Sequence, residues 1–140
     1  MRRGHDRAHA LDLHSAEHVP IPDTGTLRGD LTALARAVAA NISSVGGARR
    51  SMSIVAAAAH SEELAGTVQS FMSRRVTLAE PVVARAVERG ELPAGTDARA
   101  VIEALVGPIW FRFLFTGEAV DDSFIPALVA IVERGAGGQH

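Results

Sequence analysis

The sequence has no cysteine, no long hydrophobic run and no excess of basic charge, and each absence excludes a class of protein. Without cysteine, the chain has no disulfide framework, no thiol nucleophile and no cysteine-ligated zinc. No uninterrupted apolar run reaches the roughly 18 residues that a membrane-spanning helix requires. The formal net charge of -2 gives no overall attraction to nucleic acid.

Motifs for catalysis and metal binding are also missing. The sequence contains no glycine-rich phosphate loop, no G-x-S-x-G nucleophile motif and no H-E-x-x-H zinc motif, so an enzyme is not expected. His5, His9 and Asp12 share one face of a predicted helix at a spacing that suits a metal ion. A solvated polar face is the simpler interpretation, and neither a metal nor a cofactor is predicted.

What the sequence does have is a high apolar content, 47% of its 140 residues, arranged at helical spacing. This length suits one domain with a single core. No segment shows the sustained alternation of a β-strand. The sequence therefore predicts an all-α fold, an antiparallel bundle of about six helices. Its clearest amphipathic stripe consists of Leu27, Leu31, Leu34, Val38 and Ile42.

Capping residues and prolines set the expected helix boundaries. Ser61 is the expected N-cap of a long helix, Gly90 lies at the C′ position after it, and Pro81 should kink it. Thr96 or Asp97 is expected to cap the next helix. Besides the helix that ends near Ile42, helices are predicted over residues 6–18, 48–59, 61–89, 97–115 and 123–134.

The last two predicted helices carry apolar side chains on nearly every side. One subunit of this size cannot bury all of them, and such a surplus is typical of a helix-pair interface between two copies. The sequence therefore predicts a homodimer that forms through these two helices. The residues expected at its interface are Phe113, Phe124, Leu128, Val129 and Val132.

A ligand cavity is predicted between the long helix and the helix that follows it. Pro81 and Pro108 lie inside these two helices, and bent helices leave gaps that suit ligands. The alternative is that side chains fill the gap and both kinks are structural. The predicted lining consists of Phe71, Met72, Arg75, Gly107, Trp110, Phe111 and Arg112.

Two arginines of this lining are candidate anchors for an acidic group of a ligand, namely Arg75 and Arg112. For Arg112 a structural role is the favoured alternative. It would then pair with an acid, or with carbonyl groups at a helix end or a dimer seam.

The segment Gly107–Glu118, GPIWFRFLFTGE, resembles a stretch in the penultimate helix of TetR-type transcriptional regulators. Residues 22–31, 60–64 and 85–92 resemble other parts of the same C-terminal regulatory domain, in the same order. Together they cover about residues 20–132. The resemblance implies a cytoplasmic repressor whose domain at residues 19–134 dimerises and binds a small molecule, followed by a flexible tail at 135–140. A largely apolar pocket suggests an apolar or aromatic effector.

The same family carries an N-terminal helix-turn-helix, most of which has no counterpart in this sequence. Residues 1–18 resemble its last part and the connecting helix, with Arg7 where the family has a lysine that contacts a DNA phosphate. A recognition helix needs supporting helices, so DNA is expected as a partner only if the missing part is present. A truncated product, a misplaced gene start and a natural regulator without this part remain open. The alternative function is a standalone helical dimerisation module.

Overall fold

The computed structural model describes residues 20–44 and 46–137, and over these residues it contains helices and no strand. The all-α prediction is confirmed. The helix predicted over residues 6–18 lies outside the described residues, together with Arg7 and the group of His5, His9 and Asp12. The elements are α2 (Leu27–Ser44), α3 (Gly47–Ala58), α4 (Glu62–Ala79), α5 (Pro81–Glu88), α6 (Ala98–Phe111), the π-helical turn η1 (Arg112–Thr116) and α7 (Phe124–Gly137).

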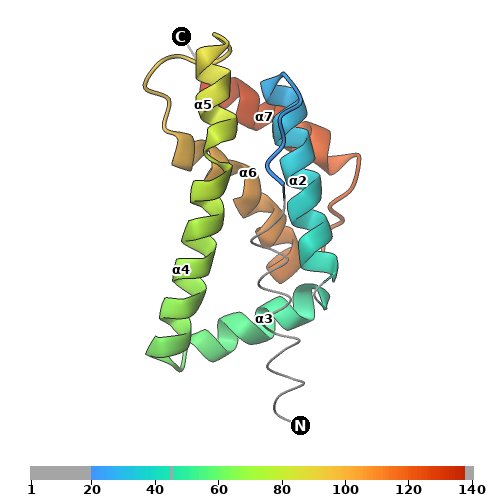
Figure 1. Cartoon of the computed structure of the whole chain (residues 1–140). Helices are drawn as coiled ribbons and strands as arrows, with labels where there is room; N and C mark the ends of the chain where they lie inside the picture. Colours follow the sequence, from blue (N-terminus) through green and yellow to red (C-terminus); the bar gives the residue numbers. More distant parts are fainter. Residues whose placement is uncertain (1–19, 45, 138–140) are drawn as a thin grey trace.

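Three helices, α2, α6 and α7, pack against one another, and α5 packs against α2 and α6. Figure 1 shows α4 and α5 following one another along one side of the molecule, with α3 joining the far end of α4 to α2. No helix in the described part of the chain is long and apolar enough to cross a membrane.

The core is built on the stripe that the spacing of α2 predicts. All five stripe residues are buried, and Leu31 is fully enclosed, because a period of 3.6 residues keeps them on one side of the helix. Most of the other core residues come from α5, α6 and α7: Val82, Val83, Ala86, Val101, Ile102, Leu105, Ile109, Ile125, Leu128, Val129 and Val132.

The predicted caps are present. The Ser61 side chain accepts a hydrogen bond from the backbone N–H of Leu64 at 3.1 Å, and Asp97 accepts one from the N–H of Ala100 at 3.0 Å. Gly90 has a φ of 81°, the left-handed conformation that favours glycine at a helix end. These local signals are sufficient to place the start of α4, the end of α5 and the start of α6.

The single helix predicted over residues 61–89 is corrected to two helices. α4 ends at Ala79 and α5 begins at Pro81. Proline is favoured in the first turn of a helix, because an N–H group at this position would have no acceptor within the helix. Glu80 between them keeps helical dihedral angles, φ -56° and ψ -31°, so α5 continues from the end of α4.

The C-terminal helices also differ in detail from prediction. α6 passes through Pro108, and its last predicted turn widens into η1, in which Gly117 N–H donates to the carbonyl of Arg112 at 2.8 Å. α7 extends to Gly137, so the first three residues of the predicted flexible tail are helical.

Candidate functional site

α4 is a long helix that contributes little to the buried core. Only Ala79 is buried among its 18 residues, whereas α2, of the same length, contributes most of one side to the core. The less exposed side of α4 is nevertheless apolar, and its residues recur at helical spacing. We call Leu64, Val68, Phe71, Met72 and Arg75 the α4 face; all five are half-buried.

Arg75 is the one charged residue of the α4 face. Its guanidinium lies over the Phe71 ring, 5.9 Å from the ring centroid. Burial lowers the pKa of Arg75, because removal of water penalises the charged guanidinium. Among the described residues, no carboxylate or carbonyl oxygen pairs with it. A partly desolvated cation without such a partner is energetically unfavourable.

α6 meets α4 through the side that carries Arg99. The Arg99 side chain donates to the Ser73 hydroxyl of α4 at 3.3 Å and to Glu103 at 3.0 Å. Val106 and Trp110 recur on this side of α6, are half-buried, and pack against the core. The structure therefore places Trp110, one of the predicted lining residues, on the side of α6 that is turned toward α4.

Gly107 and Phe111, two other predicted lining residues, lie on the side of α6 that is turned away from the core. Phe111 is 56% exposed, and a Cβ added at Gly107 would meet nothing within 4 Å. α6 buries Val101, Ile102, Leu105 and Ile109, and a rotation of about 100° per residue carries Gly107 and Phe111 to the opposite side.

Arg112 has the structural role that was favoured for it. Its guanidinium lies 3.6 Å from the centroid of the Phe124 ring and donates to the carbonyl of Ala119 at 2.8 Å. It therefore holds the loop after η1 against the start of α7.

The predicted interface residues of α7 are corrected in the same way. Leu128, Val129 and Val132 are 5%, 2% and 7% exposed within the single chain, so they belong to its own core and offer no surface to a second copy. Phe113 and Phe124 are half-buried and pack against that core. The large apolar side chains that α6, η1 and α7 do expose are Phe111, Phe115 and Ile131.

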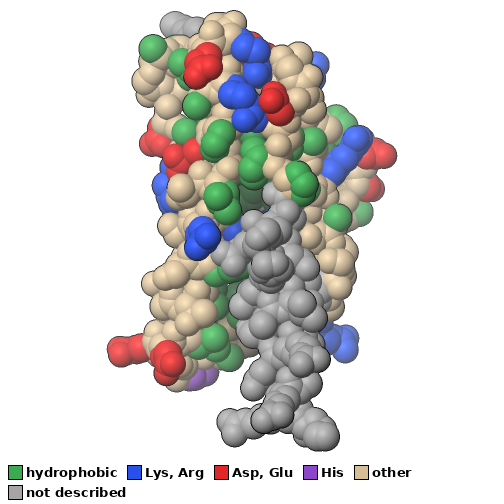
Figure 2. Space-filling model, in the orientation of Figure 1, with side chains coloured by type: hydrophobic (Ala, Val, Ile, Leu, Met, Phe, Trp, Pro, Cys, Tyr) green, Lys and Arg blue, Asp and Glu red, His purple; other side chains and the backbone are tan. Residues whose placement is uncertain are grey.

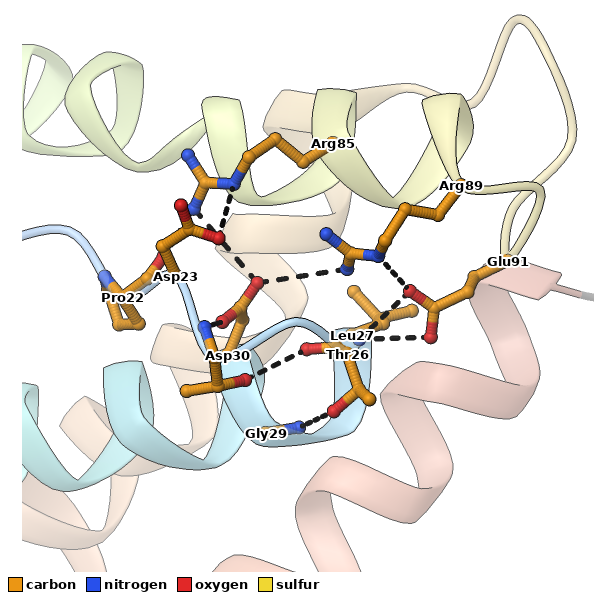
Figure 3. Close-up of polar contacts among 10 residues, drawn as sticks. Pro22, Asp23, Thr26, Leu27, Gly29, Asp30, Arg85, Arg89 and Glu91 are labelled. Carbon is orange, nitrogen blue, oxygen red and sulfur yellow. Dashed lines mark hydrogen bonds and ion pairs between the residues drawn. The ribbon is translucent and has the colours of Figure 1, made fainter.

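A polar network that the sequence did not predict joins the start of α2 to the end of α5 (Figure 3). Asp30 is fully buried. One oxygen of its carboxylate accepts from the backbone N–H of Thr24 at 2.6 Å, and the other lies 4.0 Å from Arg85 and 3.9 Å from Arg89. We call Asp30, Arg85, Arg89 and Glu91 the latch.

Glu91 completes the latch by capping α2. Its carboxylate accepts from the N–H of Leu27 at 3.0 and 3.2 Å and from Arg89 at 2.7 Å. The hydrogen bond from Leu27, and next those from Arg89, lower the pKa of Glu91. Arg85 also donates to the carbonyl of Pro22 and lies 3.5 Å from Asp23. The latch therefore fixes residues 22–30 to the end of α5.

Basic and acidic side chains lie side by side in Figure 2, near the end of the molecule where α5 and α2 are seen in Figure 1. In the sequence, the two segments that form the latch, residues 22–31 and 85–92, stand out only through their resemblance to a family. Nothing in the residue spacing of either segment predicts that the two are in direct contact.

The described surface also has an open hollow that does not match the predicted cavity. It lies over the polar side of α4 and involves none of the predicted lining residues. Its lining consists of Gln69, Ser70, Ser73, Arg74 and Thr77.

The sequence matches the family described as "Tetracyclin repressor-like, C-terminal domain" over residues 21–132. This chain belongs to that family. The TetR-like match begins beside the latch, ends within α7, and includes the α4 face.

Two relatives are whole regulators of transcription by name. The chain is 29% identical over 122 residues to "Uncharacterized HTH-type transcriptional regulator YdeS" of Bacillus subtilis (strain 168), a match that covers 86% of this chain and 61% of the relative. It is 29% identical over 127 residues to "HTH-type transcriptional regulator AqdR" of Rhodococcus erythropolis, covering 90% and 60%. The chain thus spans about three fifths of the length of these relatives.

Proposed function

We propose that this TetR-like domain senses a small apolar or aromatic effector and dimerises, and that it thereby controls DNA binding in a transcriptional repressor. The observation that carries the proposal is the α4 face. α4 has an apolar side that is only half-buried, next to the buried core. Ligand sites in helical bundles lie between helices of this kind.

The latch supports a route from the α4 face to the start of the domain. α5 continues from α4 at Pro81, and its end is fixed to residues 22–30 through Arg85, Arg89 and Asp30. A displacement of α4 on binding would therefore reach the segment that precedes α2. Allosteric control requires a connection of this kind between two sites.

Exposed apolar side chains support dimerisation. Phe111, Phe115 and Ile131 are 56%, 69% and 67% exposed, and the rings of Phe111 and Phe115 lie 5.6 Å apart. α6 and α7, which carry Phe111 and Ile131, pack against each other. Large apolar side chains exposed on paired helices are typical of a surface that a second copy covers.

A thermal-shift screen of apolar and aromatic compounds on the full chain tests the sensing role. A compound at about 100 times its Kd should add about 2.7 kcal/mol to the free energy of unfolding. Phe71→Ala should weaken the binding of a confirmed compound about tenfold, because it removes an aromatic wall.

Gln69→Ala is the control for this screen, because Gln69 is exposed and lies two residues before Phe71, on the other side of α4. It should leave the Kd unchanged. A screen without any stabilising compound, or an equal loss of affinity in the two variants, would contradict the proposed sensing role.

A further inference from the structure

We propose that the effector is an amphipathic organic anion, whose acidic group pairs with Arg75 while its apolar body lies along the α4 face. The anionic class of the effector rests on the proposed sensing function. It narrows that function from any small apolar molecule to one that carries a carboxylate or a similar acid.

The position of Arg75 is the first observation behind this proposal. Leu64, Val68, Phe71 and Arg75 follow one another at intervals of four, three and four residues, which places all four on one line along the helix. Its neighbour Arg74 lies on the exposed side. Arg75 therefore lies on the apolar side of α4. Charged side chains are rare in such positions unless they have a partner.

The second observation is that this cation lacks a counter-charge among the described residues. Glu103, an acidic residue of the facing helix α6, is already paired with Arg99 at 3.0 Å. Arg75 makes no ion pair within the described chain, and its guanidinium is partly removed from water. An acid held against it would supply hydrogen bonds in the planar, two-pronged geometry that a guanidinium favours.

The surroundings of Arg75 suit the rest of such a molecule. Phe71 supports the guanidinium through its ring face, and Leu64, Val68 and Met72 extend the apolar surface along α4. The other arginines near α6 are engaged, because Arg99 pairs with Glu103 and Arg112 with Ala119 and Phe124. Compared with Arg99 and Arg112, Arg75 thus combines an apolar setting with a charge that no described acid pairs.

Two probes of nearly the same shape test this inference, 2-naphthylacetate and its neutral amide, 2-naphthylacetamide. Binding of each probe to the full chain is measured by calorimetry. The carboxylate should bind about tenfold or more tightly than the amide, since a hydrogen bond to a charged partner supplies the difference.

Arg75→Gln should abolish this preference and leave the affinity for the amide unchanged. Arg75→Lys should keep most of the preference for the carboxylate, because lysine retains the positive charge. The matched control is Arg74→Gln, which removes a positive charge one residue away on the exposed side and should leave the preference intact.

The Tm of the protein without any probe distinguishes a ligand-binding role of Arg75 from a structural role. Arg75→Gln should leave the Tm of the free protein equal to or above that of the wild type, because it removes a partly buried charge. A lower Tm would show that Arg75 stabilises the fold and would overturn the inference, as would a persistent carboxylate preference in Arg75→Gln.

The remaining outcomes distinguish the inference from the function on which it rests. Equal binding of both probes to the wild type would overturn the anionic class and leave the sensing function standing. Binding of neither probe at millimolar concentration would overturn both. A change in the mass of the dimer with Arg75→Gln would show that a second copy covers the α4 face, and would also overturn the inference.

Discussion

Asp30 at the start of α2 and Arg89 at the end of α5 form an ion pair, with 3.9 Å between the carboxylate and the guanidinium. The carboxylate is fully buried, while 28% of the Arg89 side chain is exposed. Arg85 lies on the same carboxylate oxygen at 4.0 Å. One buried acid thus holds Arg85 of α5, Arg89 directly after this helix, and the backbone N–H of Thr24.

Asp30→Ala should lower the free energy of unfolding by about 2–4 kcal/mol, because it leaves the backbone N–H of Thr24 without its acceptor and removes the buried carboxylate that Arg85 and Arg89 share. Asp122→Ala is the control, since it removes an ion pair to Arg36 at 3.2 Å in which the Asp122 side chain is 85% exposed. It should cost less than about 1 kcal/mol. Urea denaturation of both variants measures the difference, and equal losses would contradict a stabilising latch.

Glu91 should make the stability of the latch depend on pH. Hydrogen bonds lower the pKa of Glu91 in the folded protein, so its contribution is fully present above the unfolded pKa of about 4.3 and is lost as the pH falls through the lowered folded value. Glu91→Gln should therefore have a lower Tm than the wild type at pH 7. This gap should narrow as the pH falls below about 4. A gap that stays constant between pH 7 and pH 3 would contradict the role assigned to the carboxylate.

Substitutions on α7 should separate the dimer surface from the core. Ile131→Glu should convert a dimer into a folded monomer, because it places a charge on an exposed apolar side chain of the proposed interface. Val129→Glu should unfold the chain, since Val129 is 2% exposed. Sedimentation and circular dichroism measure mass and fold. Val55→Glu on α3, where Val55 is 47% exposed, should change neither; a wild type that sediments as a monomer would contradict the proposed interface.

Arg112→Ala should destabilise the fold without affecting the sensing of an effector. The variant loses a hydrogen bond to Ala119 and the contact with the Phe124 ring, together about 1–3 kcal/mol. Denaturation and a titration with 2-naphthylacetate measure the two effects. Weaker binding with unchanged stability would return Arg112 to the list of candidate ligand anchors.

Local signals were enough to predict much of the fold. The stripe of α2, the caps at Ser61 and Asp97 and the glycine at Gly90 are each determined by residues within a single segment of the chain. The orientation of α6 was not predictable in this way, because apolar residues cover most of its circumference and leave no amphipathic direction. For that reason Gly107 and Phe111 were assigned to a cavity and are exposed instead.

Contacts between segments that are distant in the chain could not be predicted from the sequence either. Asp30 and Glu91 are ordinary polar residues in their own segments, and only the fold brings them to Arg89. Arg75 and Arg112 are both candidate anchors in the sequence, although a structural role is already favoured there for Arg112. The distinction came from the partners that Arg112 has and that Arg75 lacks among the described residues.

Hydrogen–deuterium exchange of the full chain, with and without saturating 2-naphthylacetate, tests the central claim most directly. If the α4 face binds the effector and the latch transmits the effect, exchange should slow in residues 62–79 and change in residues 22–30. Arg74→Gln should give the same pattern and Arg75→Gln should not. Slower exchange confined to segments outside α4, or unchanged exchange in residues 62–79 at a saturating concentration, would contradict the account.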